Sequence, residues 1–161
     1  MVVATTLPLE RRSIKQRLEA LVRSAAGGLS FLSPVIDLAL RIWVGTAFFK
    51  SGLTKIESWD STLYLFNNEY HVPLLPPELA AYLGTAAELG LPILLVLGLG
   101  GRFAAGALFI FNVIAVISYP DLGEVGLKDH QVWGLMLLVT LLHGPGRLSI
   151  DHVLRRWLFA R

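Results

Sequence analysis

The sequence contains no cysteine among its 161 residues. This absence excludes disulfide bonds, zinc sites built from thiolates, iron–sulfur clusters held by cysteine and covalent attachment of c-type haem. Charged residues are also scarce, at 16% of the chain against 54% hydrophobic residues. This balance is typical of a small integral membrane protein rather than a soluble domain. Because the net charge is only +2, a role in binding nucleic acid is not expected.

Apolar segments of the length that crosses a bilayer recur four times, so we predict an all-α integral membrane protein with a four-helix bundle. Proline marks two predicted helix starts, at Ser33-Pro34 and Pro76-Pro77. Glycine-rich breakers at 100–101 and 144–146 mark predicted helix ends. The predicted spans are 34–54, 77–99, 102–119 and 127–142, within a domain at 33–148.

Lys and Arg lie almost entirely on one side of this predicted topology, which places both termini in the cytoplasm. Only Lys55 and Lys128 lie on the other side. The residues on the cytoplasmic side are Arg11, Arg12, Lys15, Arg17, Arg23, Arg102, Arg147, Arg155, Arg156 and Arg161.

Segments 1–32 and 149–161 flank the predicted bundle and have the pattern of amphipathic helices lying on the cytoplasmic surface. In the first, apolar residues at near-helical spacing alternate with basic ones; they are Leu9, Ile14, Leu18, Leu21, Val22 and Ala25. Anchoring to the bilayer is the simpler interpretation of both segments, and recognition of a protein partner is the alternative.

Two charges lie inside the apolar segments, and each would cost about 3 kcal/mol if left unpaired near the bilayer centre. At 1.5 Å per residue, Arg41 and Glu88 lie about 12 and 16 Å from the inner ends of their segments. Asn112 reaches about 15 Å by the same arithmetic. We therefore predict that Arg41 and Glu88 face each other and, with Asn112, form an intramembrane polar core. The core is either a structural clasp or a site for a ligand or proton.

A second polar cluster, called here the outer mouth, is expected where the outer connections meet the bundle. Its predicted members are Lys50, Lys55, Glu69, His71, Asp129 and His130. His71 and His130 are candidate metal ligands, with Glu69 or Asp129 as a third ligand. Such a surface could receive a lipid headgroup, a quinone ring or a peptide.

Three stretches together resemble the DoxX family of four-helix membrane proteins. They are RIWVGTAFFKSGLTKI at 41–56, AAELGLPILLVLGLGGR at 86–102, and the exit motif GPGRLSID at 144–151, with Gly144, Gly146, Ser149 and Asp151. The segment LFNNEYHVPLLPP at 65–77 is similar to an extended outer connection of a bacterial subgroup.

This resemblance implies a bacterial inner, or plasma, membrane protein that contacts the bilayer and a protein partner or further copies of itself. Some relatives are subunits of thiosulfate:quinone oxidoreductases or partners of oxidative-stress complexes. The implied role is therefore an accessory subunit with quinone binding as its share of electron transfer, rather than a complete enzyme. Transport or handling of a metal or small metal-binding peptide is one alternative, because other relatives are encoded near enzymes that make such peptides. A structural adaptor is another.

Overall fold

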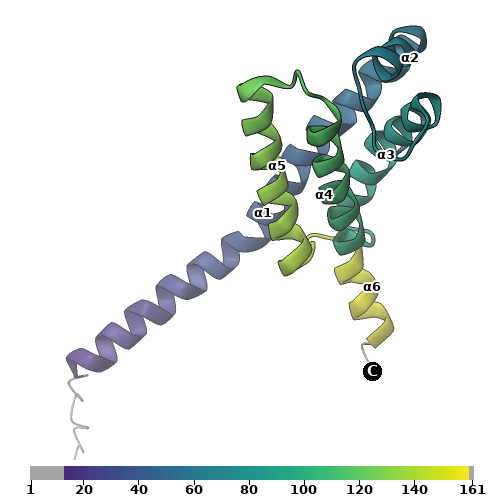
Figure 1. Cartoon of the computed structure of the whole chain (residues 1–161). Coiled ribbons are helices and arrows are strands. Elements are labelled where there is room, and N and C mark those ends of the chain that lie inside the picture. Colours follow the sequence, from purple (N-terminus) through teal and green to yellow (C-terminus); the bar gives the residue numbers. More distant parts are fainter. Residues whose placement is uncertain (1–12, 160–161) are drawn as a thin grey trace, which may run out of the picture. The chain divides into compact units, whose positions relative to one another are not determined.

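The computed structural model describes residues 13–159 and is all-α within that range, with no strand (Figure 1). Its helices are α1 (Ile14–Glu57), α2 (Trp59–Asn68), α3 (Pro77–Leu97), α4 (Gly101–Ser118), α5 (Gly123–His143) and α6 (Ile150–Phe159). The chain divides into two compact units, Met1–Ser33 and Pro34–Arg161, and every site described below belongs to the second.

The prediction that a helix starts at Pro34 is wrong, because α1 begins at Ile14 and continues through this proline. Proline in a helix removes one backbone hydrogen bond, but membrane helices tolerate this loss when side chains and neighbouring groups satisfy the freed carbonyls. Segment 14–32 is therefore the first part of a 44-residue helix and not a separate one. Leu9, Arg11 and Arg12 lie outside the described residues.

The second unit is a bundle formed by α3, α4, α5 and residues 34–57 of α1 (Figure 1). The ring of Phe48 on α1 packs edge-on against Phe111 of α4 and Trp133 of α5, with centroids 6.1 and 5.6 Å away. Leu95 and Leu108 are fully buried beside it. Aromatic edge contacts and buried leucines give the bundle a continuous apolar core.

The bundle presents an apolar surface outward, as expected of a protein in lipid. Trp43, Phe103 and Ile110 are each more than 60% exposed. Helices α1, α3 and α4 are long and apolar enough to cross a membrane. Helix α5 has 21 residues, but its first two turns carry Glu124 and Lys128, and it is not one of these three. The chain is thus a membrane protein, and its fourth crossing stays a prediction.

Helices α1 and α3 approach closely through two glycines on α1. A Cβ atom built on Gly45 would lie 2.8 Å from Val96, and one on Gly52 would lie 2.8 Å from Leu89. Small residues permit such close backbone approach in membrane bundles. These contacts fix which residues of α3 lie opposite each residue of α1.

Helix α2 lies in the connection between α1 and α3, where the sequence predicted a long segment without assigning a helix. Its buried Phe66 packs against Ala80 and Ala81 in the first turns of α3. Tyr70 follows α2, and its ring packs edge-on against both Phe66 and Tyr119. The first turns of α3 are therefore covered by α2.

Replacing Gly52 by Val should destabilise the protein by about 1–3 kcal/mol, because the added methyl groups overlap Leu89 and Glu88. Gly90→Val is a matched control on α3, since no atom lies within 4 Å of a Cβ there. Thermal unfolding in detergent measures both. Equal melting temperatures for the two variants would contradict the close contact of α1 with α3.

Candidate functional site

Arg41 does not face Glu88, so the predicted pairing is wrong. Its fully buried guanidinium donates to the backbone carbonyls of Leu95 and Val96, at 3.1 and 2.6 Å, and of Leu148, at 2.5 Å. Leu95 and Val96 lie in the last turn of α3, where a cation complements the helix dipole, and the Leu95 carbonyl also accepts from the Gly98 N–H at 3.1 Å. Arg41 therefore joins the end of α3 to the segment before α6.

The exit motif closes the same end of the bundle. The Asp151 carboxylate accepts hydrogen bonds from the backbone N–H groups of Gly100 and Gly101, both at 2.9 Å, at the start of α4. The Asp151 N–H in turn donates to the carbonyl of Gly98, at 3.0 Å. An acidic side chain at a helix N-terminus satisfies free N–H groups and complements the helix dipole.

Glycine is required where these segments meet. Gly98 has φ 65° and a Cβ there would lie 2.4 Å from the Cβ of Ser149. Gly144 and Gly146 also have positive φ, a conformation that glycine adopts without steric cost. Ser149 donates through Oγ to the Gly146 carbonyl, at 2.7 Å. We call this assembly of Arg41, the 98–101 turn and the exit motif the inner clasp.

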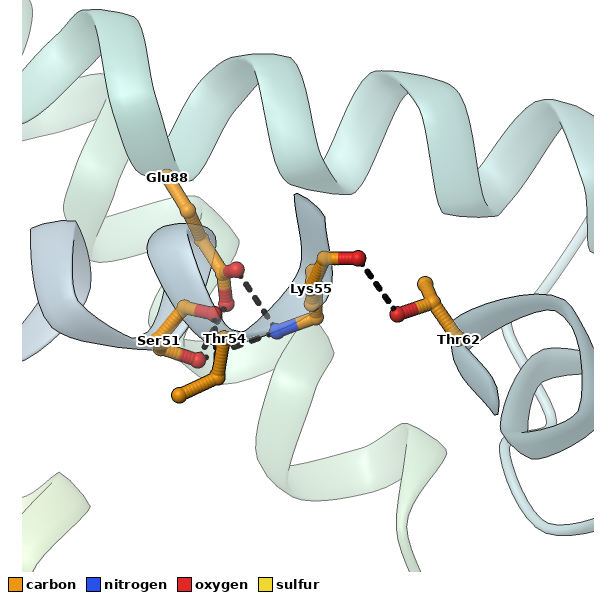
Figure 2. A network of polar contacts seen from close by, with 5 residues as sticks. All are labelled: Ser51, Thr54, Lys55, Thr62 and Glu88. Atoms are coloured by element: carbon orange, nitrogen blue, oxygen red, sulfur yellow. Dashed lines mark hydrogen bonds and ion pairs between the residues drawn. The ribbon is translucent and has the colours of Figure 1, made fainter. Parts of the chain in front are cut away.

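Glu88 pairs with Lys55, at the opposite end of the α1–α3 contact (Figure 2). Lys55 Nζ lies 2.6 Å from Glu88 Oε2, and Ser51 Oγ donates to Glu88 Oε1 at 3.1 Å. Lys55 Nζ also donates to Ser51 Oγ at 3.0 Å. The side chains of Lys55 and Glu88 are only 16% and 7% exposed, so this is a largely buried ion pair. Thr62 of α2 donates to the Lys55 carbonyl and joins α2 to the network.

The pairing was mispredicted because the ends of α1 and α3 do not align. Gly45 and Gly52 set Glu88 opposite residues 51–55, while Arg41 lies opposite the end of α3. Depths counted from the inner ends assume that both segments begin at the same level, but the C-terminal end of α3 lies beside Arg41, seven residues past Pro34. Ser51 was missed, although its spacing of four residues from Lys55 places both on one helix face.

Asn112 joins neither charge but pairs with His130 across α4 and α5. Its Nδ2 donates to the His130 carbonyl at 3.0 Å, and its Oδ1 lies 2.8 Å from His130 Nδ1. A carbonyl can only accept, so the amide's NH₂ end faces it and its oxygen faces the ring. His130 Nδ1 must then donate. The predicted single polar core is thus three separate polar sites.

A groove of about 470 Å³ runs between α4 and α5 beside this pair. Its walls are apolar and include the exposed side chains of Val113, Ile117 and Leu135. Asn112, His130 and Gln131 are its polar lining residues. At 1.5 Å per residue, His130 lies about 10 Å from the start of α5. The groove can hold an apolar molecule with one polar end.

Two of the six predicted residues of the outer mouth, Lys55 and His130, belong to other sites. Lys55 is in the ion pair with Glu88, and His130 lines the groove. Lys50 and Asp129 are exposed, as is His71, whose backbone N–H donates to the Ser118 carbonyl at 2.7 Å. Residues 13–159 contain no group of three acidic or histidine side chains placed to hold a metal ion, so Glu69 completes no such site. In the segment between α2 and α3, burial raises the pKa of the Tyr70 hydroxyl above its ordinary value.

The sequence model of the DoxX family matches residues 36–120, more than half of the chain. The chain belongs to the DoxX family. The matched region contains Arg41, Lys55, Glu88 and Asn112, and it ends before His130. An uncharacterised protein of Haemophilus influenzae is 29% identical over 133 residues, which cover 77% of this DoxX chain and 86% of the relative. No solved structure matches the chain.

Replacing Arg41 by Met in this DoxX protein should lower the free energy of unfolding by about 3 kcal/mol or more. The variant leaves the carbonyls of Leu95, Val96 and Leu148 without a charged donor. Arg155→Met removes an exposed arginine from α6 and should change stability by less than about 0.5 kcal/mol. Denaturant titration in detergent compares the two. Similar small losses would exclude the inner clasp as a stabilising element.

Proposed function

We propose that this DoxX protein is an accessory membrane subunit of a quinone-linked redox or oxidative-stress complex. The observation that carries the proposal is the groove between α4 and α5, with apolar walls and a polar site formed by Asn112 and His130. A quinone likewise combines an apolar isoprenoid tail with a polar ring. Binding sites for such molecules are mostly apolar with a few placed polar groups.

The position of the groove suits a ligand that arrives through lipid. Its wall residues Val113, Ile117 and Leu135 are exposed on the apolar surface of the bundle. A hydrophobic ligand can therefore enter sideways from the bilayer without crossing water. Iron–sulfur clusters and c-type haem depend on cysteine, which this chain lacks, so we assign electron carriers of these kinds to a partner subunit.

The proposed location is the bacterial inner membrane, with the inner clasp and both termini on the cytoplasmic side. The distribution of Lys and Arg supports this orientation. Helix α6 supports it too, because it carries Trp157 and Phe159 beside Arg155 and Arg156 and would lie on the cytoplasmic lipid surface.

No observation supports metal handling or a structural adaptor as strongly as the groove supports quinone binding. Handling of a metal would need ligands that converge, and His71 and His130 belong to different surroundings in the described chain. A purely structural adaptor would account for the inner clasp and α6 but not for the polar side chains that line the groove.

Purification in native membrane discs tests the proposal by the amount of quinone retained per protein. We expect about one quinone per chain for the unchanged protein. Leu135→Trp fills the groove and should lower the retained quinone at least tenfold, whereas Leu142→Trp is a matched control on an exposed position of α5 outside the groove.

Quantification by mass spectrometry of the extracted lipids gives the ratio, and discs without protein give the bilayer background. If all three proteins retain quinone only at that background, the proposed function is wrong. Retention that is equal in both tryptophan variants would place the quinone elsewhere and remove the groove as the support for the proposal.

A further inference from the structure

Asn112 fixes how His130 presents its second ring nitrogen. Because the Asn112 amide donates to the His130 carbonyl, its oxygen accepts from Nδ1. A neutral imidazole carries one N–H, so Nε2 then holds a lone pair and is a hydrogen-bond acceptor. An imidazolium would bring a net charge into an apolar groove, which lipid disfavours.

No residue of 13–159 donates a hydrogen bond to Nε2 of His130, which is one of the residues that line the groove. The neighbouring Trp133 contacts the ring edge-on with centroids 4.9 Å apart, which fixes the ring plane. An acceptor without a donor in an apolar environment is costly. The groove therefore favours a ligand that brings a hydroxyl or other N–H or O–H group to this nitrogen.

We infer that the groove binds the reduced hydroquinone in preference to the oxidised quinone, with its phenolic hydroxyl donating to His130 Nε2. The two redox forms have nearly the same shape, so apolar walls cannot separate them. They differ in that a hydroquinone donates hydrogen bonds whereas a quinone carbonyl only accepts them. A quinone in the same position would place two acceptors against each other.

Gln131, the other polar lining residue, does not reverse this preference. Its side-chain amide can present either its NH₂ group or its oxygen, so it serves both redox forms. Discrimination therefore rests on His130, whose tautomer is held by Asn112 on the neighbouring helix. This inference depends on the proposed function, since it names the form of the quinone that the groove selects.

Equilibrium dialysis against discs that contain the protein tests the selection with decylubiquinol and decylubiquinone, the former kept reduced under anaerobic conditions. We expect the unchanged protein to bind decylubiquinol about tenfold more tightly than decylubiquinone, because one ordinary hydrogen bond contributes that factor to the affinity. His130→Leu should bring the ratio of the two affinities close to one, and Asn112→Leu should lower it by freeing the tautomer.

Gln131→Leu is the matched control and should keep the ratio near that of the unchanged protein. The ratio separates the proposed contact from a general loss of structure, which would weaken both ligands alike. Equal affinity of the unchanged protein for both forms, or tighter binding of decylubiquinone, would overturn the inference while leaving the proposed function standing. Absence of binding of either form above the level of empty discs would defeat both.

Discussion

The close approach of α1 to α3 through Gly45 and Gly52 is the constraint on which the rest of the structure depends. A Cβ at either glycine would lie within 3 Å of a side chain on α3. Only one register of the two helices brings both glycines against α3. That register places Arg41 at the end of α3 and Glu88 beside Lys55, and so decides the partner of each charge.

Arg41 and Glu88 find different kinds of hydrogen-bonding partner inside the bundle. Arg41 donates to carbonyls at the end of α3 and to the Leu148 carbonyl, and so fastens the exit motif to the bundle. Glu88 uses a lysine from the last turn of α1. Neither charge lines the groove between α4 and α5, whose polar pair is Asn112 and His130.

The sequence predicted what depends on local physics. The lengths of the apolar segments predicted helices, and the glycines at 100–101 and 144–146 predicted where they end, which the positive φ of Gly100 and Gly144 confirms. Partners across helices could not be predicted in the same way, because they depend on register. The C-terminal end of α3 lies beside Arg41, seven residues past Pro34, so depths counted from the inner ends paired the wrong residues. The start of α1 was also wrong, because a proline alone does not end a membrane helix.

A pair of double-mutant cycles on the free energy of unfolding tests this register most directly. The first cycle combines Lys55→Met with Glu88→Met, and the second combines Arg41→Met with Glu88→Met. We expect a coupling of about 1–3 kcal/mol between Lys55 and Glu88, and one within about 0.5 kcal/mol of zero between Arg41 and Glu88. A large coupling in the second cycle with none in the first would contradict the register of α1 on α3.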